Sequence, residues 1–122
     1  MEVWCYDPYL PSGGELAMQV TRAETLEELL GACDIISVHV PLSEETTGLI
    51  GKDAIAAMMP GTMLINTARG PVVDIDALYD GLKDGKIECA SLDVLPVEPP
   101  DPEHPLIKAW LAREPWIDER LT

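Results

Sequence analysis

The sequence predicts an α/β fold built on a parallel sheet. Short apolar runs, such as Asp34–Val40 and Thr62–Ile65, alternate along the chain with segments of helical spacing. Strands that alternate with helices imply parallel strands joined by right-handed crossovers. Hydrophobic residues make up 47% of the 122 residues, enough for the packed core of about one small domain.

The N-terminal third of the chain is predicted to contain two short strands and a helix. Glu2–Tyr6 is predicted to be a strand, followed by the turn-rich stretch Asp7–Gly14. Met18–Val20 is predicted to be a short edge strand. A helix is predicted at Thr25–Gly31, because its first residue and Glu28 have capping-box spacing and its last residue is a typical C-terminal cap.

The middle of the chain predicts a strand, a helix and a second strand. Asp34–Val40 is rich in β-branched residues, and Pro41 ends it. Asp53–Met58 is predicted to be a short helix that ends before Pro60–Gly61. Thr62–Ile65 is predicted to be the next strand.

The last part predicts one more helix and one more strand. Asp74 is predicted to cap a helix that runs to about Leu82, with Gly85 near its end. Ile87–Val94 is predicted to be a strand. Residues 101–122 are expected to form a tail rich in proline and acids that leads to a final strand missing from the chain.

The most informative stretch is Asn66–Asp74, which joins a buried strand to an amphipathic helix. In open parallel α/β sheets, ligands bind where the strands end at their carboxyl side. Arg69 lies at such a point, and a guanidinium can bind a carboxylate through two hydrogen bonds. Arg69 is therefore predicted to bind an acidic substrate, with a surface ion pair as the alternative.

Charge and composition exclude several classes of function. The formal net charge of −14 argues against direct binding to nucleic acid or to an anionic membrane, since both need a basic surface. No apolar run approaches the ~20 residues of a membrane span, and Met1–Trp4 lacks the basic region of a signal peptide. Cys5, Cys33 and Cys89 lack metal-ligand spacing and are predicted to be buried free thiols of a cytoplasmic protein.

An acidic residue, Asp7, ends the first predicted strand. In dinucleotide-binding folds such an acid holds ribose hydroxyls and lies ~20 residues after a Gly-rich phosphate loop. Only six residues precede Asp7, so that loop has no room, and Gly13–Gly14 follows Asp7 and cannot replace it. A turn-forming role before Pro8 is the alternative.

Seven short motifs follow one another along the chain from Val3 to about Pro105. They are Tyr6-Asp7-Pro8-Tyr9, Val38-His39-Val40-Pro41-Leu42, Thr46-Thr47-Gly48-Leu49-Ile50, Met59-Pro60-Gly61, Ile65–Asp74, Leu92-Asp93-Val94 and Glu98-Pro99. In this order and spacing they closely resemble the NAD-dependent D-isomer-specific 2-hydroxyacid dehydrogenase family. Tyr6–Leu10 looks like the C-terminal-binding-protein branch, whose members are transcriptional corepressors of the same fold.

The resemblance implies a Rossmann-type, doubly wound parallel sheet that lacks its first βα unit, with residues 1–122 forming a partial NAD-binding domain. It implies NAD as cofactor, a small 2-hydroxy or 2-keto acid as substrate, and a homodimeric parent protein. Asp7 also disfavours the 2′-phosphate of NADP through charge repulsion.

The resemblance also implies a role for each matching residue. The residues that would bind NAD are Asp7 at the adenosine ribose, His39, Val40, Pro41 and Thr46 on the adenine and ribose side, Thr67 and Ala68 at the nicotinamide, and Asp93 at its carboxamide. Arg69 would bind the substrate carboxylate and polarise its carbonyl. Glu98 would orient a catalytic histidine and raise its pKa, since hydride transfer to a ketone needs a proton donor that titrates near neutrality. Solvated acids are the alternative for Asp93 and Glu98.

The sequence departs from the family's pattern at both ends. The Gly-rich loop, the catalytic histidine and a substrate domain are not among the 122 residues. The chain is therefore expected to be a fragment that is inactive alone. His39 is predicted to be a wall residue, and His104 is not expected to be the proton donor because it lies in a Pro-rich loop only six residues after Glu98.

Three functions stay open at this point. The parent protein is expected to be an oxidoreductase that moves hydride between NAD and a small 2-hydroxy or 2-keto acid. A corepressor-like protein that senses NAD is the alternative, and a partner-peptide groove would favour it. The third reading is an inert fragment, and a Gly-x-Gly-x-x-Gly codon run upstream of the gene would support truncation.

Overall fold

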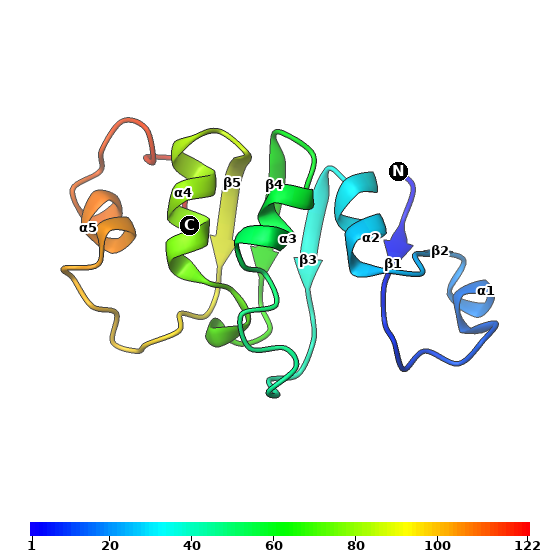
Figure 1. Cartoon of the computed structure of the whole chain (residues 1–122). Helices are drawn as coiled ribbons and strands as arrows, with labels where there is room; N and C mark the ends of the chain where they lie inside the picture. The colour runs from blue at the N-terminus through cyan, green and yellow to red at the C-terminus, as the bar shows by residue number, and fades with distance from the viewer.

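The computed structural model describes residues 1–122, in which every strand pairing is parallel (Figure 1). The strands form two separate sheets, one of two strands and one of three. The first sheet pairs β1 (Trp4–Cys5) with β2 (Thr21–Arg22), and the second has the order β3 (Ile35–Val38), β4 (Thr62–Asn66), β5 (Ile87–Leu92). The predicted incomplete, parallel α/β fold is confirmed.

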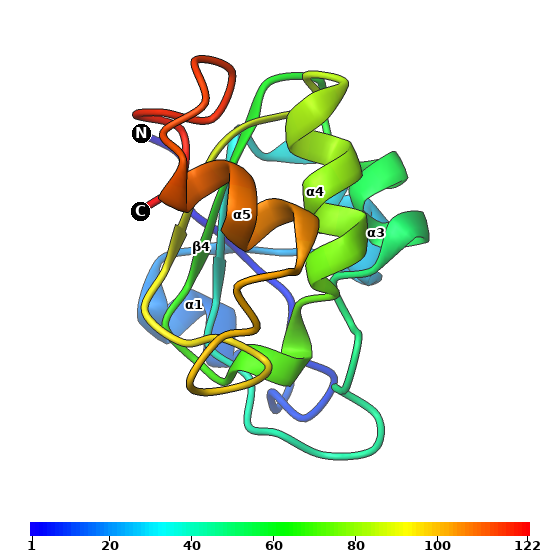
Figure 2. The same ribbon diagram turned by 90° about the vertical axis from the view of Figure 1, so that its left-hand side faces the viewer.

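The helices alternate with these strands, and all of the α-helices except α1 and α5 are predicted from the sequence. They are α1 (Gly14–Met18), α2 (Leu26–Ala32), α3 (Lys52–Ala57), the 3₁₀ turn η1 (Gly70–Val72), α4 (Ile75–Lys83) and α5 (Pro105–Leu111). Helices α3 and α4 lie on the same side of the three-stranded sheet (Figure 2). No helix is long and apolar enough to cross a membrane.

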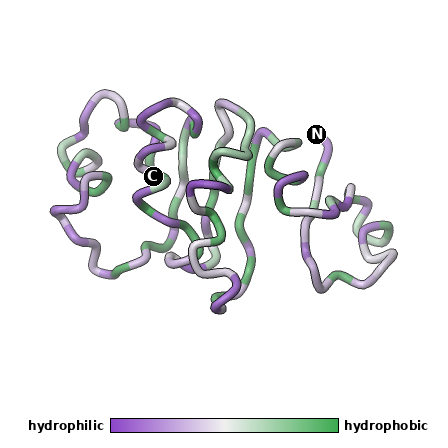
Figure 3. Tube along the Cα trace, in the orientation of Figure 1, coloured by the Kyte–Doolittle hydropathy of each residue, from purple (hydrophilic) through white to green (hydrophobic).

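The core joins the three-stranded sheet to buried residues of α2, α3, α4 and α5. Burial alternates along β3, where Ile36 and Val38 are buried and Ile35 is half exposed. Hydrophobic segments concentrate in this sheet and on the helices that cover it (Figure 3). Gly81 allows close packing of α4, because a Cβ there would lie 3.0 Å from side-chain atoms of both Ile55 and Ile87.

The predicted strand at Met18–Val20 is wrong. Gly14–Met18 is instead the helix α1, and the edge strand β2 begins at Thr21. The helix starts after Gly13 with φ 88° and ends at Gln19 with φ 56°, so left-handed residues at both ends set its limits. The chain can then turn into a strand only beyond Gln19.

The predicted start of α2 is confirmed, and its predicted end is wrong. The Thr25 side chain accepts a hydrogen bond of 3.1 Å from the Glu28 N–H, as expected of a helix N-cap. The helix continues through Gly31 to Ala32, with Cys33 as its cap. At Gly31 a Cβ would lie 3.7 Å from the Ala57 carbonyl oxygen, so this glycine lies where α2 meets α3.

Residues 101–122 contain regular secondary structure, whereas the sequence predicts a tail rich in proline and acids. They contain α5, and Leu121 then returns to the sheet in a parallel bridge to Ala90. The Leu92 N–H donates to the Thr122 carbonyl at 2.7 Å. A further ladder beside β5 therefore starts within the chain, which corrects the expectation that this strand is missing altogether.

No strand pairs with the edges of β1 and β3 that face away from their partners. The carbonyls of Val3 and Cys5 accept hydrogen bonds from Thr21 of β2 and from Ala23 just after it. The carbonyl of Asp34 accepts a hydrogen bond from Met63 of β4. Alternate residues of a parallel strand bond to opposite neighbours, so the backbone groups of Trp4 and Ile35 point to the free edges. Figure 1 shows β1 and β3 running in the same direction with no strand between them.

Candidate functional site

The turn after β4 is held by the buried side chain of Asn66, which has 0% exposure. Its Oδ1 accepts a hydrogen bond from the Ala68 N–H at 3.0 Å, and its Nδ2 donates to the Arg69 carbonyl at 3.1 Å. Thr67, Ala68 and Arg69 therefore form a closed turn at the carboxyl end of the central strand.

Arg69 is exposed at this turn and has no carboxylate within 4.0 Å. Its Nη1 donates to the Ala68 carbonyl at 2.6 Å, so the guanidinium folds back over its own turn. The remaining N–H groups have no partner in the protein. A guanidinium with free donors at the end of a parallel strand is suited to binding a carboxylate.

The end of β3 lies level with this turn, because Val38 and Asn66 are register partners. His39 is exposed, and its Nε2 lies 2.8 Å from the Ser37 hydroxyl. This contact joins Ser37 of β3 to the residue that directly follows the strand.

The loop after β3 is closed by Thr46. Its hydroxyl donates to the Pro41 carbonyl at 2.6 Å and accepts a hydrogen bond from the Ser43 N–H at 2.8 Å. Val40 and Thr46 are half-buried, whereas Pro41 is exposed. The predicted adenine-side residues thus belong to one fixed loop at the same end of the sheet as Arg69.

The loop after β5 also meets this site. The Asp93 N–H donates to the Asn66 carbonyl at 3.0 Å, which joins the ends of β4 and β5. A Cβ on Gly70 would lie 2.0 Å from the Leu95 carbonyl oxygen, so only glycine allows this approach. Glu98 accepts a hydrogen bond from the Leu95 N–H at 3.0 Å, which leaves its other carboxylate oxygen available.

Asp7 lies at the end of the separate two-stranded sheet. Its Oδ1 accepts a hydrogen bond from the Tyr9 N–H at 2.9 Å, the contact expected of a turn-forming aspartate. The Tyr9 hydroxyl then donates to Glu45 at 2.9 Å. This bond links the turn of Asp7 to the loop of Thr46, and it raises the pKa of Tyr9 because the phenol donates to a carboxylate.

His104 is not part of this arrangement. It caps α5 by accepting a hydrogen bond from the Leu106 N–H at its Nδ1, at 3.2 Å. Its Nε2 lies 3.0 Å from Asp76 in the first turn of α4. Both ring nitrogens are thus occupied in holding two helices together, which argues against a role as proton donor.

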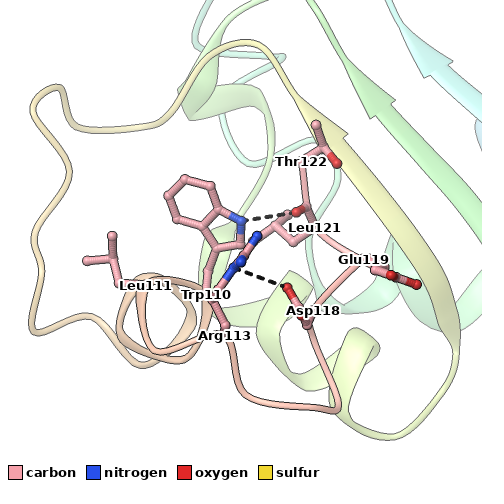
Figure 4. Close-up of a pocket in the computed structure, with 7 residues that line it drawn as sticks. All are labelled: Trp110, Leu111, Arg113, Asp118, Glu119, Leu121 and Thr122. Carbon is pink, nitrogen blue, oxygen red and sulfur yellow. Dashed lines mark hydrogen bonds and ion pairs between the residues drawn. The ribbon is translucent and has the colours of Figure 1, made fainter.

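The cavity drawn in Figure 4 lies elsewhere, between the end of α5 and the C-terminal residues. It has a volume of about 490 Å³ and contains none of the predicted site residues. Its lining consists of Trp110, Leu111, Arg113, Asp118, Glu119, Leu121 and Thr122. The indole of Trp110 donates to the Leu121 carbonyl, and Arg113 pairs with Asp118, so these polar groups are engaged within the protein.

The cysteines are free but only half-buried, which corrects the prediction of full burial. Burial and neighbouring carboxylates raise the pKa of Cys33, so its thiol is less ionised than an ordinary one. Among residues 1–122, no three His, Cys, Asp or Glu side chains gather into a group that could hold a metal ion.

Three features of the site are absent from the sequence predictions: the Asn66 clamp, the close approach at Gly70, and the bond between Tyr9 and Glu45. Asparagine is known to bond to the backbone two residues ahead, so its place directly after an apolar strand was a usable signal. The other two features join segments that are far apart in sequence, and no local pattern indicates them.

Comparison with known families gives a match over residues 1–112 to the D-isomer specific 2-hydroxyacid dehydrogenase, NAD binding domain. The chain is 44% identical over 109 residues to D-3-phosphoglycerate dehydrogenase of Archaeoglobus fulgidus, covering 88% of this chain and 20% of that protein. It is 48% identical over 99 residues to (S)-sulfolactate dehydrogenase of Chromohalobacter salexigens, covering 81% of this chain and 32% of that protein. The chain thus spans between a fifth and a third of these relatives.

Solved structures give the same result. D-mandelate dehydrogenase of Rhodotorula graminis in a holo form superposes with a TM-score of 0.76 at 42% identity, over 82% of this chain and 29% of that one. A D-isomer specific 2-hydroxyacid dehydrogenase of Xanthobacter autotrophicus, in complex with NADPH and MES, superposes with a TM-score of 0.74 at 34% identity. That match covers 98% of this chain and 44% of the other.

Proposed function

The chain belongs to the D-isomer specific 2-hydroxyacid dehydrogenase family and matches its NAD-binding domain, and from this premise we propose that it is part of an oxidoreductase. The reaction is hydride transfer between NAD and a small 2-hydroxy or 2-keto acid. The observation that carries the proposal is Arg69, an exposed cation without an ion-pair partner at the carboxyl end of the central strand β4. Residues 1–122 form part of the NAD-binding domain in this proposal, and the whole protein acts as a homodimer.

Arg69 binds the carboxylate of the substrate in this proposal. Its free N–H groups can form a two-pronged contact, and the protein's negative charge makes a local cation the favoured place for an anionic ligand. The names of the relatives, phosphoglycerate and sulfolactate dehydrogenases, also point to small acids. When the guanidinium also approaches the carbonyl oxygen, it stabilises the negative charge that develops there during reduction.

The residues present fit the two ends of NAD. The exposed Asp7 carboxylate uses one oxygen for the Tyr9 N–H and keeps the other for ribose hydroxyls. At the other end, the exposed Thr67 and Asp93 flank the turn of Arg69 and suit the nicotinamide and its carboxamide. NAD supplies or accepts the hydride when it is bound. The carboxylate of Asp7 favours NAD over NADP, although one structural relative is seen with NADPH.

Proton transfer needs a further group beyond these 122 residues in this proposal. His39 contacts Ser37, and His104 is held between Leu106 and Asp76. The free oxygen of Glu98 is suited to orienting an imidazole near the turn of Arg69. The 122 residues by themselves are therefore expected to bind a keto acid without turnover. The relatives described above are dehydrogenases, and no observation favours the corepressor alternative.

The role of Arg69 is tested by titrating the 122-residue chain with oxamate, an unreactive keto-acid analogue, and following backbone amides by NMR. Arg69→Ala should weaken binding roughly tenfold, because a charge-assisted contact is lost. Arg69→Lys should give an intermediate value, since it keeps the charge without the planar fork. No NADH oxidation is expected with glyoxylate.

The matched control is Lys52→Ala, which removes an equal charge from an exposed side chain paired with Asp80 on the helical side of the protein. It should leave oxamate binding unchanged. Equal weakening by Lys52→Ala and Arg69→Ala would mean that only the general field of the protein matters, and would contradict the proposed anion site.

A further inference from the structure

The fully buried side-chain amide of Asn66 forms hydrogen bonds to the turn of Arg69. At 0% exposure it uses Oδ1 as acceptor for the Ala68 N–H and Nδ2 as donor to the Arg69 carbonyl. The two backbone groups require one acceptor and one donor from the same side chain. An amide supplies both without charge, whereas a carboxylate supplies only acceptors.

The position of Asn66 means that this clamp, the pair of hydrogen bonds from its side chain to the turn, also connects the ends of neighbouring strands. Its register partners are Val38 on β3 and Leu92 on β5, so it lies in the middle of the three strand ends. Its own carbonyl accepts from the Asp93 N–H at 3.0 Å. One residue therefore fixes the turn of Arg69 and ties it to the loop of Asp93.

We infer that Asn66 is a positioning residue for the anion site, which sets where the Arg69 guanidinium meets its ligand. This inference rests on the proposed function of Arg69. The guanidinium itself makes one internal hydrogen bond, to the Ala68 carbonyl. That carbonyl belongs to the turn that Asn66 closes. Loss of the clamp therefore displaces both the backbone of Arg69 and the carbonyl on which its guanidinium rests.

The test uses Asn66→Asp and Asn66→Leu in the 122-residue chain, with oxamate titrations by NMR at pH 5 and pH 8. The aspartate keeps the acceptor for Ala68, but its ionised form presents an oxygen to the Arg69 carbonyl. Protonation restores a donor, and burial raises the pKa of such a carboxyl. Oxamate affinity should fall roughly tenfold at pH 8 and recover at pH 5. Asn66→Leu offers no hydrogen bond and should lose affinity at both values.

Two controls isolate the clamp from stability and from other titrations. Wild-type protein measured at both pH values accounts for the ionisable groups of the site, which are Arg69, His39, Asp93 and Glu98. Thr62→Val removes the other buried polar side chain of β4, whose hydroxyl donates to the Met59 carbonyl at 2.7 Å. It should lower thermal stability and leave oxamate affinity unchanged.

Each outcome decides the inference. Wild-type oxamate affinity in Asn66→Leu would overturn the inference, and so would an equal loss of affinity at both pH values in Asn66→Asp. If Asn66→Leu does not fold, Asn66→Asp decides. Wild-type protein that does not bind oxamate would overturn the anion site at Arg69 itself. Hydrogen exchange of the Ala68 amide, expected to be fast only when the clamp is lost, would then still show whether Asn66 holds the turn.

Discussion

At the scale of single residues, the carboxyl ends of the strands collect side chains whose bonding capacity is only partly used. Arg69 keeps free donors, and Asp7 and Glu98 each use one carboxylate oxygen for a backbone N–H. Each is exposed. The two fully buried polar side chains, Asn66 and Thr62, are satisfied internally. Hydrogen-bonding groups that stay free at the exposed ends of the strands are what a ligand site requires.

A residue-scale prediction concerns Tyr9, whose pKa lies above the ordinary 10.0 because its hydroxyl donates to Glu45. The protonated phenol is favoured in the folded protein, so its contribution is present below pH 10 and is lost as the pH rises through the raised pKa. Titration of the tyrosine absorbance near 295 nm should show one late-ionising phenol that is absent in Tyr9→Phe.

The same titration of Glu45→Gln supplies the control, because glutamine can accept the hydrogen bond but carries no charge. The late phase should then move towards pH 10 without disappearing. An unchanged curve in Glu45→Gln would show that the loop of Glu45 and the turn of Asp7 are not linked in solution.

At the scale of elements, the site depends on how closely two loops approach each other. The turn at η1 meets the segment after β5 at Gly70, where a Cβ would lie 2.0 Å from the Leu95 carbonyl oxygen. Backbone cannot move aside as a flexible side chain can. The short 3₁₀ turn and the loop of Glu98 can therefore lie this close together only because Gly70 has no side chain.

An element-scale prediction follows for Gly70→Ala. Forcing a methyl group into this contact should lower the free energy of unfolding by about 1–3 kcal/mol, the usual cost of overpacking. It should also weaken oxamate binding, because the loops of Arg69 and Glu98 separate. Chemical denaturation and the NMR titration measure the two effects.

Gly31→Ala is the matched substitution for Gly70→Ala. Its Cβ would lie 3.7 Å from the Ala57 carbonyl oxygen, an ordinary contact inside helix α2. This change should leave stability the same or raise it slightly, because alanine favours helices over glycine. The steric explanation fails if Gly70→Ala is tolerated as well as Gly31→Ala.

At the scale of the whole molecule, the two sheets are separate, and β1 and β3 each present an unpaired edge. Unpaired strand edges recruit other chains. We therefore expect the 122-residue chain to self-associate with rising concentration, as measured by size-exclusion chromatography with light scattering. Ile35, which is 51% exposed beside this edge, should be part of the contact.

Substituting Ile35→Lys places a charge beside the free edge of β3 and should shift the chain towards the monomer. Leu111→Lys, at a side chain that is 59% exposed on α5, serves as the comparison and should have less effect. A monodisperse wild-type monomer with protected amides at Trp4 and Ile35 would contradict the prediction.

The sequence by itself determined the family and most of the elements, but not the helices α1 and α5. Alternating apolar and amphipathic segments indicated parallel α/β structure, and the motifs around Arg69 and Asp93 indicated the dehydrogenase family that the comparisons show. These signals are local, since they depend on side-chain periodicity, caps and turn residues. The error at Met18–Val20 was also local, because three residues are too few to distinguish the periodicity of a strand from that of a helix.

Only the tertiary structure decided how the site is assembled. The approach at Gly70, the bond from Tyr9 to Glu45 and the pairing of His104 with Asp76 join residues that are 25, 36 and 28 positions apart. Such contacts depend on how the sheet brings loops together, and no periodicity in the chain encodes their geometry. The sequence thus predicted which residues would carry the chemistry, and the packing of the parallel strands decided which of them meet.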